Sequence, residues 1–234
     1  MQLIPVIDLK RGKVVRAHQG DRERYQPVSG SKICSNAEPA SVAAALISAF
    51  HCEAIYVADL DAIEGTGNHN EHLEAIGSSY PDTAVWLDAG FRAYLQLARW
   101  RRFPNVIPVI GSETVLSMGA YIEILTHFPN AILSLDYRNE TFLGPTGLFE
   151  QPSAWPGRII HLNLAHVGGN GGPDIAGLRD TMQKAAGRMT FLGGGIRSLD
   201  DWRTVAQTGA AGALLATALH NGAITPTATR ESLS

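Results

Sequence analysis

The chain has 234 residues, of which 45% are hydrophobic and 18% charged, with a formal net charge of −3. This composition is typical of a globular protein with one substantial core, and the slight acidic excess argues against a nucleic-acid partner, which normally meets a basic face. Two cysteines without neighbouring metal-type ligands, and no apolar stretch near the roughly 20 residues of a membrane helix, predict a cytoplasmic protein without disulfides, metal or membrane partner.

Short apolar runs rich in β-branched residues alternate with amphipathic segments along the whole chain, a pattern typical of parallel strands covered by helices. The runs predict strands over residues 3–9, 54–61, 84–88, 106–110, 132–137, 159–164, 189–192 and 211–216. Apolar residues at i, i+3 and i+4 predict helices over 41–50, 94–103, 121–128, 175–186 and 199–208. The Gly- and Pro-containing segment 139–156 predicts a hairpin or loop. Since no composition break divides residues 1–234, we expect one domain.

The two halves of the sequence resemble each other. Val-Trp-Leu-Asp-Ala-Gly-Phe-Arg at 85–92 aligns with Thr-Phe-Leu-Gly-Gly-Gly-Ile-Arg at 190–197, and an amphipathic segment follows each. Two halves of four β/α units each predict a (β/α)8 TIM barrel with a two-fold half-barrel repeat. An open, doubly wound sheet is the alternative, but it gives no reason for the repeat.

Two aspartates end predicted strands, which is where α/β barrels carry their reactive groups. Asp8 ends the first strand and Asp136 ends the fifth, so they stand opposite each other in an eight-strand ring. We predict that they form an acid/base pair. The alternative is that each caps a loop or pairs with Lys10 or Arg138.

A glycine run follows the seventh predicted strand and opens a helix. Absent side chains let an anion reach backbone N–H groups at a helix start, and barrels commonly hold phosphate there together with the loop after the eighth strand. Ser198 and Asp200 as caps of the next helix are compatible with this function. The predicted phosphate contacts are Gly193, Gly194, Gly195, Arg197, Ala216 and Thr217.

The matching position in the first half carries Asp88 instead of glycine. Two like charges at ~4 Å repel by ~4 kcal/mol at an effective dielectric near 20, whereas a helix N-terminus contributes at most ~2 kcal/mol of attraction. We therefore expect Asp88 to exclude a second phosphate and to receive an amine, cation or hydroxyl of the ligand. Further predicted substrate contacts are Gly90, Ser112, Asn163, His166 and Gly169, and the polar segment 21–39 is either a lid or a solvated loop.

The sequence resembles the family of the histidine-biosynthesis ProFAR isomerase and of the cyclase subunit of imidazole glycerol phosphate synthase. The matching motifs span residues 4–20, 57–62, 109–112, 133–136, 193–198 and 216–222. The resemblance implies that Asp8 is the general base and Asp136 the general acid of an Amadori rearrangement, in which an aminoaldose becomes an aminoketose without cofactor or metal. Such a pair requires two environments that hold different protonation states.

The sequence departs from the family at Asp88 and Ala89, which replace phosphate-loop glycines, and at Leu162 and Asn163 in the sixth strand. It therefore resembles a side branch of the family that is found with genes for one-carbon cofactors of the methanopterin or methanofuran type. We expect an isomerase-like or related lyase enzyme acting on a small phosphorylated, amine-bearing metabolite. The alternatives are a genuine ProFAR isomerase and a non-catalytic barrel that binds a metabolite or partner; the sequence leaves the oligomeric state open.

Overall fold

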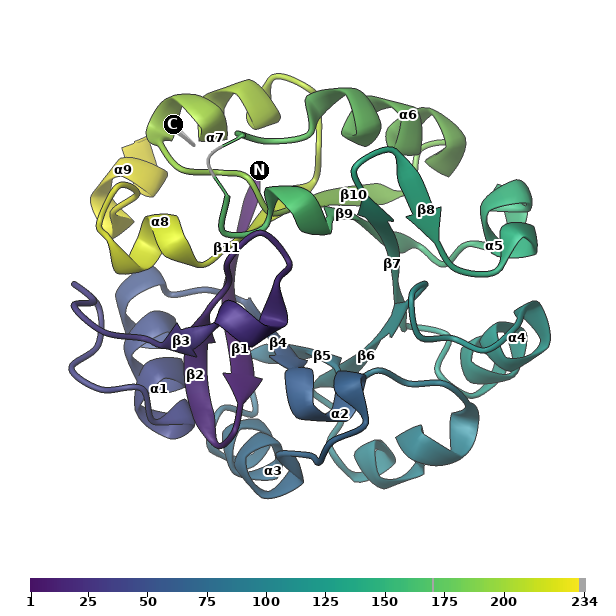
Figure 1. Cartoon of the computed structure of the whole chain (residues 1–234), viewed down its shortest axis with the longest axis horizontal. Helices are drawn as coiled ribbons and strands as arrows, with labels where there is room; N and C mark the ends of the chain where they lie inside the picture. The colour runs from purple at the N-terminus through teal and green to yellow at the C-terminus, as the bar shows by residue number, and fades with distance from the viewer. Residues whose placement is uncertain (170, 232–234) are drawn as a thin grey trace.

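The structure is a computed structural model that describes residues 1–169 and 171–231. Within them, eight parallel strands close into a barrel surrounded by helices (Figure 1). The ring closes because β1 pairs with β4 on one side and with β11 on the other. The predicted (β/α)8 barrel is thus confirmed. Its strands are β1 (Gln2–Lys10), β4 (Ala54–Asp59), β5 (Ala84–Asp88), β6 (Val106–Gly111), β7 (Ile132–Arg138), β9 (Arg158–Asn163), β10 (Met189–Gly193) and β11 (Gly212–Leu215).

In the described part, no helix is both long and apolar enough to span a membrane. Most helices cover the outside of the barrel, whereas the short helix over residues 60–64 lies at the barrel opening, where Leu60 and Ile63 line the site cavity (Figure 1). The helices are α1 (Pro39–Phe50), α2 (Leu60–Glu64), α3 (Asn70–Ser79), α4 (Met118–His127), α5 (Thr146–Glu150), α6 (Ile175–Ala185), α7 (Leu199–Ala206), α8 (Thr217–His220) and α9 (Pro226–Glu231). The segment predicted as a helix over 94–103 is a 3₁₀-helix, η2 (Tyr94–Arg102). Its buried residues Leu97 and Trp100 are three apart, which suits the three-residue turn of this helix type.

Short additional strands lie in two of the connections between barrel strands, after β1 and after β7. β2 (Lys13–Arg16) pairs antiparallel with β1, and β3 (Gln26–Pro27) pairs with β2; a short 3₁₀-turn, η1 (Arg22–Arg24), lies between β2 and β3. At the fifth connection β8 (Thr141–Leu143) pairs antiparallel with β7, and only the five-residue α5 and the turn η3 (Pro152–Ala154) follow. Segment 139–156, predicted as a hairpin or loop, begins as the β7–β8 hairpin and continues as two short helical turns. The β1–β2 hairpin was not predicted from the sequence.

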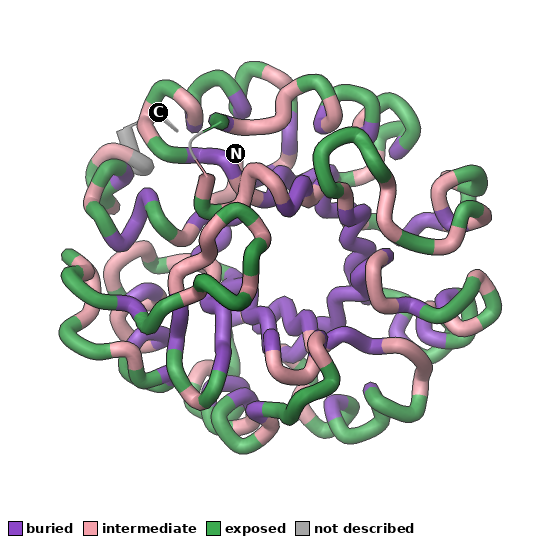
Figure 2. The backbone as a smooth tube through the Cα atoms, viewed as in Figure 1, coloured by how far each residue is buried: buried purple, intermediate pink, exposed green. Residues whose placement is uncertain are grey.

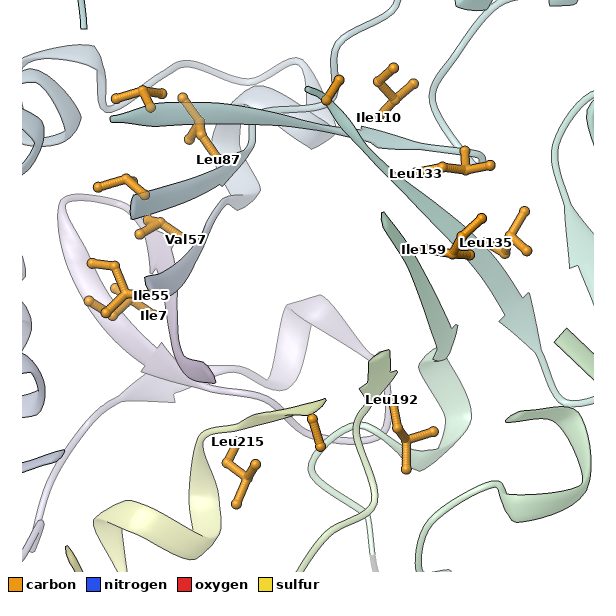
Figure 3. Packing of buried hydrophobic residues seen from close by; sticks show 14 of the residues in the cluster. Ile7, Ile55, Val57, Leu87, Ile110, Leu133, Leu135, Ile159, Leu192 and Leu215 are labelled. Atoms are coloured by element: carbon orange, nitrogen blue, oxygen red, sulfur yellow. The ribbon is translucent and has the colours of Figure 1, made fainter. Parts of the chain in front are cut away.

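Side chains alternate between the two faces of each barrel strand, as pleated strands require. Outward residues such as Ile55, Val57 and Leu133 pack against the helices (Figure 3). Inward residues such as Trp86 and Phe191, whose rings meet edge-on with centroids 4.9 Å apart, fill the barrel. Figure 2 shows the strands as a buried ring within half-exposed helices.

The strand predicted over 54–61 ends earlier, at Asp59. The Asp59 carboxylate accepts a hydrogen bond from the Ala62 N–H at 3.1 Å and so caps α2. Asp8, Asp88 and Asp136 stand at or near the ends of their strands, and the alternation of side chains turns all three inward. They therefore lie at the carboxyl end of the barrel, where the catalytic residues of such barrels stand.

Candidate active site

Three aspartates meet inside the carboxyl end of the barrel, one each on β1, β5 and β7. Asp8, Asp88 and Asp136 are 9%, 7% and 2% exposed. Gly111 at the end of β6 leaves room for two of them, because a Cβ there would lie 3.3 Å from Asp136 Oδ2 and 3.7 Å from Asp88 Oδ2. The predicted pair Asp8 and Asp136 is therefore part of a cluster of three carboxyl groups.

Asp8 presents a bare carboxyl group. No described residue donates a hydrogen bond to it, and the ion pair with Lys10 considered from the sequence does not form because Lys10 pairs with Glu64 at 3.1 Å. Burial raises the pKa of Asp8 to about 7; the Arg22 guanidinium lowers it and the Asp88 carboxylate raises it. Asp8 lines a cavity of about 90 Å³. Such a group is free to exchange a proton with a ligand in that cavity.

Asp136 is held firmly. Its Oδ1 accepts a hydrogen bond from the Ser134 hydroxyl at 2.6 Å, and its Oδ2 accepts from the Glu113 N–H at 3.0 Å and from the Ser112 hydroxyl at 3.3 Å. Burial, then the Glu113 charge, raises its pKa to about 8, although the hydrogen bonds oppose the shift. Ser112, predicted to contact substrate, lines neither site cavity and instead orients Asp136.

Asp88 accepts a hydrogen bond from the Tyr56 hydroxyl at 2.9 Å and one from the Gly90 N–H at 3.1 Å. Burial raises the pKa of Asp88 to about 6, and both hydrogen bonds counteract that shift. Gly90 therefore acts on the site through its backbone. Tyr56 was not predicted as a site residue. The alternation of β4 nevertheless indicates that it faces inward, because it stands between the outward residues Ile55 and Val57.

The turn η1 covers part of the same cavity through Arg22. Arg22 and Glu113 form an ion pair across the cavity mouth, and Lys10 Nζ donates a hydrogen bond to the Arg22 carbonyl at 3.0 Å. Figure 1 shows this turn as a dark purple segment at the edge of the barrel opening. Of the two interpretations of segment 21–39, the position of Arg22 over the cavity favours a lid.

Glu113 was not predicted as a site residue. It follows the end of β6 and lies one residue beyond the motif at 109–112.

The glycine run joins this cavity to a second one of about 190 Å³. Gly194 and Leu214 line both cavities. Gly194 and Gly195 have φ of +85° and +83°, which side chains rarely adopt. Their N–H groups and that of Ile196 find no acceptor among the described residues. Of the predicted residues, the second cavity brings together Gly194, Gly195, Arg197, Ala216, Thr217, His166 and Gly169, while Gly193 lines the first.

Asn163 lies away from both cavities, and the side chain of Arg197 is paired at the rim of the second. Asn163 faces outward from β9, and its Nδ2 donates to the Asn139 carbonyl at 3.0 Å and to Asp174 Oδ2 at 2.8 Å. The alternation of the strand, which puts Leu162 inside, puts Asn163 outside. Arg197 reaches the rim of the second cavity, but its Nε donates to Asp201 at 3.0 Å.

Comparison with known proteins supports the resemblance of the motifs. The family model described as histidine biosynthesis protein matches residues 2–225. The chain belongs to this family. It is 28% identical to an uncharacterized protein of Methanocaldococcus jannaschii, over 96% of this chain and 95% of the relative. Proteins of Halorhodospira halophila (26%, covering 96% and 94%) and Roseobacter denitrificans (29%, covering 96% and 95%) are also similar, and both are named as the phosphoribosyl imidazole-4-carboxamide isomerase, the ProFAR isomerase.

Proposed function

We propose that this protein is an aldose–ketose isomerase that works by aspartate acid/base chemistry on a small phosphorylated, amine-bearing metabolite. The observation that carries the proposal is a bare Asp8 that lines a cavity together with Gly194, with the anchored Asp136 in the same carboxyl cluster behind Asp88. Membership of a family whose named relatives are isomerases supports it.

The two aspartates suit different tasks. With a pKa of about 8, Asp136 holds its proton at neutral pH and serves as the acid that protonates the oxygen on the amine-bearing carbon of the aminoaldose. That C–O bond then breaks, with release of water or opening of the sugar ring, and an imine forms. With a pKa of about 7 and no hydrogen-bond donor of its own among the described residues, Asp8 is ionised in a large fraction of molecules and takes the proton from the carbon next to the imine. Return of a proton to the resulting enaminol completes the aminoketose.

The ends of the ligand would bind to opposite chemistry. The free N–H groups at Gly194, Gly195 and Ile196 suit a phosphate at the start of α7. Asp88, kept largely ionised near neutral pH by the Tyr56 hydroxyl and the Gly90 N–H, suits an amine. The pathway, one-carbon cofactor biosynthesis, stays a prediction from the sequence resemblance.

A genuine ProFAR isomerase is the second candidate, since relatives of this chain carry that name. Its substrate has a phosphate at each end, and Asp88 occupies the place of the second. Conversion of ProFAR by the purified protein, or rescue of a histidine auxotroph, would favour this candidate over the proposed small substrate.

The proposal is tested with the full chain and a panel of three- to five-carbon aldose phosphates mixed with methylamine, followed by NMR detection of the aminoketose. Asp8→Asn and Asp136→Asn should each lower the rate by about 10²–10⁴-fold, the usual contribution of a positioned acid or base. Asp82→Asn, at an exposed loop residue, is the matched control. Unchanged rates in both active-site variants would refute the acid/base assignment. A rate no higher than the uncatalysed background in the unaltered chain would favour a non-catalytic binding barrel.

A further inference from the structure

The two cavities adjoin and together make up the ligand chamber. The smaller measures about 90 Å³ and is lined by the carboxyl groups of Asp8, Asp88 and Glu113, and the larger measures about 190 Å³ and is lined by the glycine loop. Gly194 and Leu214 line both cavities, and a Cβ on Gly194 would lie only 2.9 Å from Val167 Cγ2. A side chain at position 194 would therefore crowd the boundary between the two cavities.

The segment after β2 covers part of the solvent side of the chamber. The Arg22–Glu113 ion pair spans the smaller cavity, and the hydrogen bond from Lys10 holds the backbone of Arg22. Farther along the rim, a Cβ on Gly168 would lie 2.1 Å from the Ala17 carbonyl oxygen, so the two loops touch. A ligand that binds under this cover has to fit the volume of the two cavities.

That volume sets a size for the ligand. A protein cavity of about 150 Å³ holds benzene, which has six non-hydrogen atoms. On this scale the smaller cavity takes about four non-hydrogen atoms and the larger about seven or eight, which suffices for a phosphate ester and a short linker. A ligand with two phosphoribosyl groups is several times too large.

The charges of the smaller cavity set the chemistry of the ligand's free end. Asp8, Asp88 and Glu113 line it, and the only guanidinium or ammonium group in its described lining is that of Arg22, which Glu113 already pairs. Much of the remaining wall is apolar, with Val6, Ala58 and Leu162 among its residues. A short chain that ends in a positive charge fits this environment.

We infer that the substrate is a short-chain monophosphate, with a body of about four non-hydrogen atoms that ends in an amine facing Asp8 and Asp88. This inference rests on the proposed function and narrows it to a substrate class. The Arg22–Glu113 pair is then a determinant of substrate length, because it spans the mouth of the smaller cavity.

The experiment measures binding, not turnover, by calorimetry with the full chain. The probes are inorganic phosphate, propyl phosphate, 3-aminopropyl phosphate and 6-aminohexyl phosphate. We expect 3-aminopropyl phosphate to bind at least tenfold more tightly than propyl phosphate, which lacks the amine, and at least tenfold more tightly than the longer 6-aminohexyl phosphate.

Two variants separate the contributions of charge and length. Asp88→Asn should reduce the preference for 3-aminopropyl over propyl phosphate about tenfold while leaving propyl phosphate binding unchanged. Arg22→Ala should improve the binding of 6-aminohexyl phosphate relative to the three-carbon probe. Arg24→Ala, in the same turn but exposed, should not change that ratio.

The outcomes distinguish this inference from the proposed function. Tighter binding of 6-aminohexyl phosphate, or equal binding of propyl and 3-aminopropyl phosphate, would overturn the substrate class while leaving the isomerase proposal in place. Selective binding of 3-aminopropyl phosphate, with isomerase activity that ignores Asp8 and Asp136, would overturn the proposed chemistry alone. No binding of any phosphate probe would refute both.

Discussion

The loops after β5 and β10 occupy matching positions in the two halves of the barrel and share one contact. The Arg92 N–H donates to the Gln96 side chain at 2.6 Å, and the Arg197 N–H donates to the Asp201 side chain at 2.9 Å.

The two loops differ just before that contact. After β5, the Gly90 N–H donates to Asp88 at 3.1 Å, whereas the matching Gly195 N–H after β10 finds no acceptor within the described chain. The difference therefore comes from Asp88, a carboxylate at the position where the β10 loop has Gly193.

The helices that follow reinforce the difference. The β10 loop leads into the α-helix α7, whose start is capped by the Ser198 hydroxyl accepting from the Asp201 N–H at 3.1 Å. The β5 loop leads into the 3₁₀-helix η2, whose first turn is closed by Gln96. On the proposed function, the β10 half of the barrel binds a phosphate and the β5 half presents a carboxylate to an amine.

Converting the β10 loop into the β5 type should have the largest effect. Gly193→Asp places a carboxylate at the position that matches Asp88, where its charge would repel a phosphate by ~4 kcal/mol at ~4 Å and an effective dielectric near 20. We expect the affinity for inorganic phosphate to fall about a thousandfold in ³¹P NMR titrations. Gly157→Asp adds the same charge at an exposed site with no heavy atom within 4 Å of the new Cβ, and should bind phosphate normally. Equal affinities in the two variants would remove the glycine loop as the phosphate site.

The cost of the carboxyl cluster should be visible as pH-dependent stability. Because the pKa of Asp8 is raised from 3.8 to about 7 in the folded protein, its stability contribution is fully present below pH 3.8 and is lost as the pH rises through 7. Asp8→Asn should therefore raise the free energy of unfolding by about 4 kcal/mol at pH 8, and by clearly less at pH 5, in urea unfolding. The exposed Asp82→Asn should show no such dependence. A loss of stability in Asp8→Asn at pH 8 would contradict the raised pKa.

The sequence was sufficient for the barrel because the strand signal was strong and repeated: all eight apolar runs are strands, and the duplicated motif singles out the closed ring. It was also sufficient to place Asp8 and Asp136 at the carboxyl end of the barrel. It was insufficient for contacts that depend on side-chain direction or on folded loops. Asn163 ends a strand but points outward, and the roles of Gln96 and Glu113 depend on loop geometry that no local pattern encodes.

Converting the β5 loop into the β10 type should give a smaller gain. The combined change Asp88→Gly and Ala89→Gly removes the repelling carboxylate and frees the Gly90 N–H, which now donates to Asp88. We expect phosphate stoichiometry in calorimetry to rise from one to two, with the new site binding at least tenfold more weakly because η2 remains a 3₁₀-helix. Gln96→Ala alone keeps Asp88 and should stay at one. A double variant that also stays at one would show that the helix type, not the Asp88 carboxylate, separates the two halves.

Removing the Tyr56 hydroxyl should have the smallest effect of these changes, because this hydroxyl stabilises the ionised form of Asp88 after β5. Tyr56→Phe removes that donor, so the pKa of Asp88 should rise further above about 6, and the loss of stability should be larger at pH 8, where Asp88 is ionised, than at pH 5. Tyr121→Phe is a matched control, since the Tyr121 hydroxyl donates to the Ala154 carbonyl at 2.9 Å and touches no titrating group; its cost of about 1 kcal/mol should not change with pH. Equal costs for Tyr56→Phe at both pH values would mean that Asp88 does not ionise between them. The β5 loop would then present a neutral carboxylic acid to the ligand. It would differ from the β10 loop by the bonded Gly90 N–H alone, and not by a charge.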